Sequence, residues 1–474
     1  MPELTGRKTE KQILLNALHS KRSELVVVYG RRRIGKTFLV REVYKNKINI
    51  ELIGVRKASL KDQLKNFHLK LSVKDKNVPM PLDWQEAFHY LEHYLNKVKS
   101  NKKKIIFIDE FPWLDTRKSK FLPAFEYFWN SYVSSKDDIV VVICGSAASY
   151  MIQKIINDRG GLHNRITEKI RLSPFNLFET ENFFKSQKVK LTRFDIVQVY
   201  MALGGIPFYL EKVLPGESVP QMLDRLCFST NGFLRTEFSN VFTALFDQHD
   251  NHEKIIRQLA IVKKGLTRKE ILKKSKTNTG GRLTKTLKEL EESGFIEKYS
   301  PYSGKKNSLY RLSDEYSMFY LKYIENTKPS NAGIWMKLQA QQSYKIWSGF
   351  TFETICIKHV EQIKEALKIT GIETKHGSWL DKKSSKQGAQ IDLIIDRSDN
   401  VINLCEMKFY NTTYTIDKKY ANEIVNKQNA FINSSKTQKS VFITFITSYG
   451  LKNNKYKQQY VQNELTLTDL FIEL

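Results

Sequence analysis

The residues best suited to chemistry lie near the start of the chain. Residues 30–37 follow the pattern Gly-x-x-x-x-Gly-Lys-Thr, directly after an apolar, β-branched run at 25–29 and before a predicted helix at 38–44. Glycines let backbone N–H groups close around phosphates, the lysine reaches the β and γ phosphates, and the threonine hydroxyl binds Mg²⁺. The predicted nucleotide-binding residues are Gly30, Arg31, Arg32, Arg33, Ile34, Gly35, Lys36 and Thr37, with ATP and Mg²⁺ as the ligands.

Two acidic residues end a second buried strand, predicted over 104–108. Asp109 is expected to hold the Mg²⁺ together with Thr37, and to complete the nucleotide site. Glu110 follows it, where a carboxylate can polarise the attacking water, so we predict an ATP-hydrolysing enzyme. A third apolar run, 139–144, precedes Ser146, which either senses the γ-phosphate or is a simple turn residue.

Several short motifs accompany the loop: Gly6-Arg7-x-x-Glu10, Asp109-Glu110-Phe-Pro-Trp113, Gly145-Ser146, Arg165 before 170–175, and Gly204-Gly-Ile-Pro207. Together they resemble the archaeal-type ATPases, a family of the STAND branch of the AAA+ superfamily, over residues 1–240. The resemblance implies an ATPase core followed by a small helical lid, in which residues 204–207 begin the segment that rests against the nucleotide; a plain helix break is the alternative. It also implies a catalytic role for Arg165 beside a phosphate, with a surface arginine as the alternative. Since STAND proteins often assemble when ATP-loaded, an ATP-dependent homo-oligomer is a further expectation.

The middle of the chain is strongly basic: residues 263–288 contain ten Lys or Arg residues and one acidic residue. Periodicity predicts helices over 253–262, 267–273 and 281–293, then strands over 295–299 and 309–312. This order resembles a winged helix-turn-helix, whose third helix enters the DNA major groove. The predicted DNA-binding residues are Arg282, Lys285, Lys288, Lys305 and Lys306. The alternative is a protein-interaction module of the same fold.

A second group of charged residues lies near the C-terminus. Apolar runs predict strands over 390–395 and 401–408, after a helix over about 344–368 that carries Glu353. Because side chains alternate along a strand, Glu406 and Lys408 share one face, and Asp392 projects beside them from the adjoining strand. Two carboxylates can hold Mg²⁺ or Mn²⁺, while a lysine can position water or stabilise charge at phosphorus.

Residues 335–450 thereby resemble the restriction-endonuclease-like, or PD-(D/E)XK, superfamily, although Ile391 stands where that motif has proline. The resemblance implies the catalytic residues Glu353, Asp392, Glu406 and Lys408, with the metal held by Asp392 and Glu406. The alternatives are a degenerate nuclease fold kept for DNA binding, or surface charges on a hairpin. Tyr410, Lys418, Lys419 and Lys427 continue the basic character; we interpret the lysines as a solvated helix face, with a phosphate track as the alternative.

Composition limits the remaining classes. The net charge of +27 favours a polyanionic partner, with a lysine-rich solvated surface as the alternative. The apolar runs are too short for a membrane span, and the polar N-terminus is unlike a secretory signal. The four cysteines have neither the spacing of a zinc site nor the density of a disulfide scaffold, so we expect reduced thiols in a cytoplasmic protein.

The sequence therefore predicts an α/β multidomain protein with an AAA+-like P-loop ATPase core (1–175), a helical lid (176–245), a winged helix-turn-helix (246–328) and a restriction-endonuclease-like domain (335–474). The predicted function is an ATP-hydrolysing DNA-binding protein with a Mg²⁺-dependent DNA endonuclease domain. The main alternative is a nucleotide-switched DNA-binding or scaffold protein with an inert nuclease-like domain, and a chaperone-like ATPase acting on protein is a third hypothesis.

Overall fold

The computed structural model describes residues 4–100, 102–157, 160–246, 248–262, 264–276, 281–302, 308–330, 333–380 and 389–474. The chain forms two compact units, Met1–Pro174 with Ala244–Asp247, and Phe175–Thr243 with Gln248–Leu474. The first unit ends at Pro174, one residue before the predicted end of the ATPase core. The predicted boundary at 245–246 lies in the short piece 244–247 of the first unit, and the predicted boundary at 328–335 lies inside the second unit. Among the described residues, no helix has the length and apolar character needed to cross a membrane.

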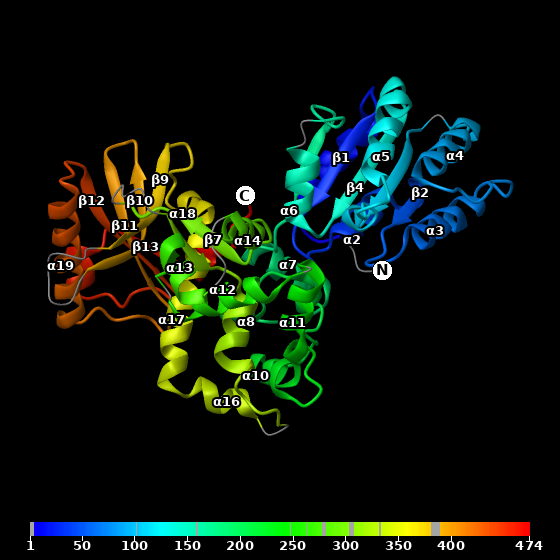
Figure 1. The fold of residues 1–474 in the computed structure, drawn as a ribbon. Coiled ribbons are helices and arrows are strands. Elements are labelled where there is room, and N and C mark those ends of the chain that lie inside the picture. Colours follow the sequence, from blue (N-terminus) through cyan, green and yellow to red (C-terminus); the bar gives the residue numbers. More distant parts are fainter. Residues whose placement is uncertain are drawn as a thin grey trace. The chain divides into compact units, whose positions relative to one another are not determined.

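A five-stranded parallel sheet organises the first unit (Figure 1). Its order is β2-β3-β4-β1-β5, with β1 Glu24–Tyr29, β2 Ile48–Ile53, β3 Lys104–Asp109, β4 Ile139–Gly145 and β5 Glu168–Arg171. The helices are α1 Lys8–His19, α2 Lys36–Tyr44, α3 Leu60–Ser72, α4 Trp84–Lys97, α5 Phe121–Ser131 and the short α6 Ala148–Tyr150.

The central strands β1, β3 and β4 are buried along almost their whole length, as expected of a parallel sheet covered on both faces. The core of the unit joins these strands to an aromatic cluster from α3, α4 and α5 that includes Phe67, Trp84, Phe88 and Phe121. This packing fixes the carboxyl ends of β1, β3 and β4 side by side at one edge of the sheet. The phosphate loop follows β1 at that edge, Asp109 is the last residue of β3, and Ser146 follows β4.

The second unit begins with a group of helices: α7 Leu177–Ser186, α8 Arg193–Leu203, α9 Pro207–Leu210, α10 Val219–Leu223 and α11 Leu234–Leu245. Gly204 and Gly205 follow the end of α8. Gly204 has φ +65°, and an added Cβ on Gly205 would lie 1.9 Å from the carbonyl oxygen of Phe175, whose N–H donates back to Gly205 O at 2.7 Å. The motif is therefore a close backbone crossing that only glycine permits.

Residues 250–312, called the middle segment below, contain α12 Asp250–Ile261, β6 Leu266–Thr267, α13 Arg268–Ser275, α14 Gly281–Glu292, β7 Ile296–Tyr299 and β8 Leu309–Leu312. The three predicted helices and two predicted strands are all present. The prediction missed β6, a strand of two residues that pairs with β8 and gives an antiparallel sheet of order β6-β8-β7. Two residues are too few to produce a period-two pattern.

Helices then lead from the middle segment into the C-terminal sheet. They are α15 Glu315–Phe319, α16 Ile334–Gln339, α17 Gln342–Lys358 and α18 Val360–Ala366. The single helix predicted over 344–368 is wrong, because His359 interrupts it with φ −106° and ψ 28°. The buried imidazole there accepts a hydrogen bond from Leu177 N at 3.0 Å and joins the chain to α7.

The C-terminal sheet has the order β13-β12-β11-β10-β9. Its elements are β9 Thr374–Leu380, β10 Gln390–Arg397, β11 Val401–Lys408, α19 Lys418–Ser435, β12 Ser440–Thr447, α20 Lys455–Tyr460 and β13 Asn463–Thr466. Strands β9, β10 and β11 form an antiparallel meander, while β11, β12 and β13 run parallel. Helix α19 connects β11 to β12 and packs Ile424 and Phe431 into the core of the sheet.

Candidate functional site

The phosphate loop joins β1 to α2. Lys36, the first residue of α2, is 6% exposed, and its Nζ donates to the loop carbonyls of Gly30 at 3.1 Å and Arg31 at 2.8 Å. Burial lowers the pKa of the Lys36 ammonium, while the nearby Cys144, Glu110 and Asp109 act against that shift. Gly30 has φ +147°, and a Cβ there would lie 2.3 Å from Leu172 O. The loop thus has the glycine, lysine and helix start that a phosphate site needs.

Thr37 and Asp109 lie together at this edge of the sheet. Thr37 Oγ1 donates to Asp109 Oδ2 at 2.7 Å, although the two residues are 72 positions apart in sequence. A hydroxyl and a carboxylate in contact provide the hard oxygen ligands that Mg²⁺ prefers. The predicted pair therefore fits a nucleotide-bound Mg²⁺, which the carboxylate and hydroxyl would hold and which would neutralise phosphate charge.

Glu110 is held by Ser146. Its Oε2 accepts hydrogen bonds from Ser146 Oγ at 2.8 Å and from Ser146 N at 3.3 Å, and its own backbone has φ 47°. Strand β4 lies between β1 and β3, which brings the residue after β4 next to the end of β3. Ser146 is thus more than a turn residue, because it orients the carboxylate predicted to polarise water.

No described contact joins Arg165 to the phosphate loop. Its side chain is exposed, its backbone N donates to Leu162 O at 3.0 Å, and no side-chain hydrogen bond or ion pair is seen for it within the described parts of the chain. Its catalytic role stays a prediction.

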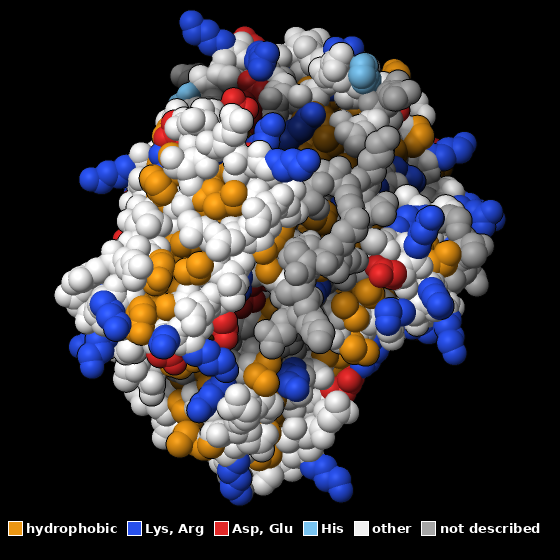
Figure 2. Space-filling view, turned by 90° about the vertical axis from the view of Figure 1, so that its left-hand side faces the viewer, with side chains coloured by type: hydrophobic (Ala, Val, Ile, Leu, Met, Phe, Trp, Pro, Cys, Tyr) orange, Lys and Arg blue, Asp and Glu red, His pale blue; other side chains and the backbone are white. Residues whose placement is uncertain are grey.

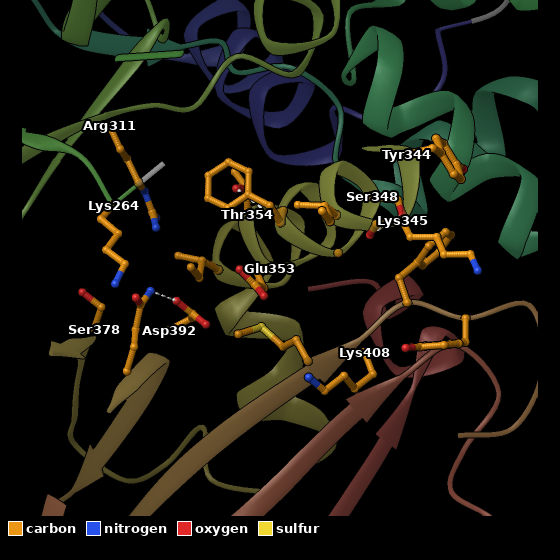
Figure 3. Close-up of a pocket in the computed structure, with 18 of the residues that line it drawn as sticks. Lys264, Arg311, Tyr344, Lys345, Ser348, Glu353, Thr354, Ser378, Asp392 and Lys408 are labelled. Atoms are coloured by element: carbon orange, nitrogen blue, oxygen red, sulfur yellow. Dashed lines mark hydrogen bonds between the residues drawn. The ribbon is translucent and has the colours of Figure 1, made fainter. Parts of the chain in front are cut away.

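The C-terminal candidates lie around a cavity of about 1600 Å³ in the second unit. Glu353 from α17, Asp392 from β10 and Lys408 from β11 all line it, and Figure 3 shows the three side chains turned toward one space. Gln390, which the sequence reasoning missed, donates from Nε2 to Asp392 Oδ1. Partial burial and the neighbouring Glu406 raise the pKa of Asp392, whereas Gln390, Lys427 and Lys408 act to lower it.

Glu406 lies behind this cavity rather than in its lining. The β10–β11 register, which pairs Leu393 with Cys405, places Glu406 opposite Asp392 as predicted. Glu406 is 8% exposed, and its carboxylate accepts from Tyr420 OH at 2.6 Å and pairs with Lys427 Nζ at 2.6 Å. Lys408 Nζ lies 4.5 Å from the centre of the Tyr420 ring. Helix α19 therefore engages both residues of the Glu-x-Lys motif.

The interpretation of Lys427 as part of a solvated helix face is wrong, because its ammonium pairs with Glu406, whereas Lys418 and Lys419 are exposed. A signal was present in the sequence: Tyr420, Ile424 and Lys427 follow helical spacing, so they share the face that packs on the sheet. No cluster of three or more His, Cys, Asp or Glu side chains suited to a metal occurs in the described residues. The predicted metal ligands Asp392 and Glu406 lie opposite each other on β10 and β11.

The predicted DNA-binding residues on α14 are exposed. Lys285 and Lys288 form loose ion pairs with Glu289 and Glu292 on the next turn, at 3.8 and 3.6 Å, and Arg282 bonds Gln248. Lys305 and Lys306 lie outside the described residues. The face of the second unit that carries β12 and α19 presents more Lys and Arg than Asp and Glu side chains (Figure 2).

Comparison with known proteins finds a similarity to an ATPase domain in the N-terminal part. Residues 4–213 match the family model described as an ATPase domain predominantly from Archaea. An uncharacterised protein of Methanocaldococcus jannaschii is 28% identical over 414 residues, which cover 85% of this chain and 87% of that protein. A Walker-type ATPase of Pyrococcus abyssi has a similar fold, with 18% identity and a TM-score of 0.50 over 68% of this chain and 98% of that one. The Gly-x-x-x-x-Gly-Lys-Thr loop and the contact between Thr37 and Asp109 agree with the match of residues 4–213 to this ATPase domain.

Proposed function

We propose that the protein is an ATP-hydrolysing, DNA-binding protein whose C-terminal sheet is a Mg²⁺-dependent DNA endonuclease domain of the restriction-endonuclease-like type. The observation that carries the nuclease proposal is the convergence of Glu353, Asp392 and Lys408, from three different elements, on one cavity. The antiparallel β10–β11 pair supports it further by setting Glu406 opposite Asp392.

The proposed reaction is hydrolysis of a phosphodiester. A water oxygen bonds to phosphorus, one P–O ester bond breaks, and the departing oxygen takes up a proton. Asp392 and Glu406 would hold Mg²⁺, which supplies Lewis-acid stabilisation of the charge developing at phosphorus. Lys408 would orient the water or stabilise the same charge, and Glu353 would accept a hydrogen bond from the water. For Glu406 to serve as a ligand, its contact with Lys427 must open.

DNA binding is assigned to the middle segment, which we propose to be a winged helix-turn-helix. The exposed Arg282, Lys285 and Lys288 of α14 support this assignment, because their contacts on the exposed helix surface are weak enough to exchange for phosphates. A cytoplasmic location is part of the proposal, supported by four cysteines that are all buried and unpaired.

The deciding experiment measures cleavage of single-stranded, double-stranded and supercoiled DNA with Mg²⁺ or Mn²⁺, with and without ATP. Wild type is compared with Asp392→Asn, which keeps the shape of the side chain, and with Lys36→Ala. Loss of cutting in Asp392→Asn supports the nuclease, and an additional loss in Lys36→Ala couples it to the nucleotide. A wild type that binds DNA and cuts none of the substrates refutes the nuclease.

One observation favours a second function. The Glu406 carboxylate is already bound by Tyr420 and Lys427, an arrangement suited to a nuclease-like fold that binds without cutting. In that case the protein is a nucleotide-switched DNA-binding or scaffold protein. ATP would then change DNA affinity in the wild type and in Asp392→Asn alike, while Lys36→Ala would lose the response.

A further inference from the structure

The cavity that holds Asp392 is built from three parts of the second unit. The middle segment contributes Lys264 and Arg311, and helices α16 and α17 contribute Met336 and Lys345. The C-terminal sheet contributes β10, the strand that carries Asp392. In Figure 3 the Lys264 side chain extends toward the end of the cavity where Asp392 lies. The basic segment thus directs part of its charge into the candidate nuclease site.

This wall is fixed by contacts with the C-terminal sheet. Tyr302 N donates to Ser378 O at 2.8 Å, and Tyr302 OH donates to Asp396 at 2.9 Å. The Tyr302 ring also packs against Phe431 of α19, with ring centres 5.5 Å apart. Tyr299 OH donates to Lys264 O at 2.6 Å and holds the backbone that presents the lysine. The middle segment is therefore a structural part of the cavity.

The charges in the lining favour an anion. Among the residues that the structure describes, five cationic side chains line the cavity, against the two carboxylates Glu353 and Asp392. Arg311 is paired with Glu297, and Lys427 is paired with Glu406. The other three cations have no ion pair with a carboxylate of the described residues: Lys264, Lys345 and Lys408. Unpaired lysines on several walls can contact successive phosphates of one chain.

Exposed apolar side chains lie among these lysines. Tyr410 is 50% exposed, Ile346 58% and Met336 60%, and all three line the cavity. Unpaired bases present flat faces that stack on such side chains, whereas the bases of a duplex are already stacked and paired. A volume of about 1600 Å³ also exceeds the roughly 300–1,000 Å³ typical of a small-molecule pocket.

We propose that this cavity binds a single strand of nucleic acid, with Lys264 as a phosphate anchor and Tyr410 as a stacking platform for a base. The inference deepens the proposed function, since it places an unpaired strand beside Asp392 as the substrate. It also gives the middle segment a second role, separate from the exposed face of α14.

Binding without cutting provides the test. Fluorescence anisotropy in EDTA measures the affinity of the full chain for labelled oligo-dT and oligo-rU of about 12 nucleotides, a length within the usual site size, and for a blunt DNA hairpin. Lys264→Glu is matched by Lys269→Glu, an exposed lysine of α13 outside the cavity lining. Tyr410→Ala is matched by Tyr410→Phe, which keeps the ring. Thermal melts establish that each variant is folded.

We expect the two cavity variants to lose affinity for the single strand and to keep affinity for the hairpin, which the exposed face of α14 would hold, within twofold of wild type. Lys264→Glu should weaken single-strand binding about tenfold, and Tyr410→Ala about five- to tenfold, within the range for one lost base stack. Lys269→Glu and Tyr410→Phe should stay within twofold of wild type. Equal losses of single-strand and hairpin binding in Lys264→Glu, or equal losses of single-strand binding in Lys264→Glu and Lys269→Glu, would overturn the inference. Because no cleavage is involved, failure of the nuclease proposal would leave this result intact.

Discussion

The Lys427 ammonium on α19 lies 2.6 Å from the Glu406 carboxylate on β11, and Tyr420 OH bonds the other oxygen of the same carboxylate. Burial together with this carboxylate raises the pKa of Tyr420, so the phenol remains a hydrogen-bond donor. One helix thus controls whether the second candidate metal ligand is free to bind a cation.

Lys427→Ala should destabilise the second unit by about 1–3 kcal/mol, because it leaves a mostly buried carboxylate without its cation. Urea unfolding followed by tryptophan fluorescence measures the change. Lys419→Ala, which removes an exposed lysine from the same helix, should change the free energy of unfolding by no more than about 0.5 kcal/mol. Adding Glu406→Gln to Lys427→Ala should recover most of the loss, and an additive double mutant would contradict the pairing.

The same variant tests metal binding without an activity assay. Mn²⁺ should raise the melting temperature of Lys427→Ala more than that of wild type, because in the variant no lysine ammonium competes with Mn²⁺ for Glu406. Adding Asp392→Asn should remove this gain. An equal Mn²⁺ response in wild type and Lys427→Ala would count against the two-carboxylate metal site.

Lys36→Ala should lower affinity for ATP at least tenfold, because the buried ammonium that faces the loop is lost. Isothermal titration calorimetry with ATP and Mg²⁺ measures the affinity. Lys47→Ala, an exposed lysine of the same unit, should bind ATP like wild type. Retained affinity in Lys36→Ala would mean that the nucleotide does not occupy this loop.

Glu110→Gln should bind ATP normally and hydrolyse it about 10²- to 10⁴-fold more slowly, the usual loss on removal of a general base. Ser146→Ala should give a smaller loss, because it frees the Glu110 carboxylate without removing it. Steady-state phosphate release and ATP affinity are measured side by side. If Ser146→Ala turns over ATP at the wild-type rate, the serine does not position Glu110.

His359 should make the second unit sensitive to acid. Burial lowers its pKa from about 6.5 to about 4, and its Nδ1 donates to Ile355 O at 2.8 Å while Nε2 accepts from Leu177 N. The folded state holds His359 neutral, whereas the unfolded chain takes up a proton at a pKa near 6.5. The stabilisation is therefore fully present above pH 6.5 and is lost as the pH falls toward 4. The loss amounts to roughly 3 kcal/mol between pH 7 and pH 4. His359→Gln should flatten the unfolding free energy over that window relative to wild type.

Local patterns were enough to predict where the candidate nucleotide site and the strands around it lie. Each of these features is recognisable within a few residues: the Gly-x-x-x-x-Gly-Lys-Thr loop, the apolar run before it, and Asp109 at the end of a strand. Strands β1, β3 and β4 lie where the apolar runs predict them. The opposition of Asp392 and Glu406 also followed from strand alternation across a short turn.

What the sequence by itself determined is thus the identity of the phosphate loop, its acidic partners and the strands that carry the charged residues. The tertiary structure alone decided that Ser146 holds Glu110, that Lys427 binds Glu406 and that Tyr302 docks the middle segment against the C-terminal sheet. Those pairs are 36, 21 and 94 residues apart. The reason is physical: hydrophobic periodicity fixes which face of an element is buried, but partners across elements are chosen by sheet order and packing, which no local pattern encodes.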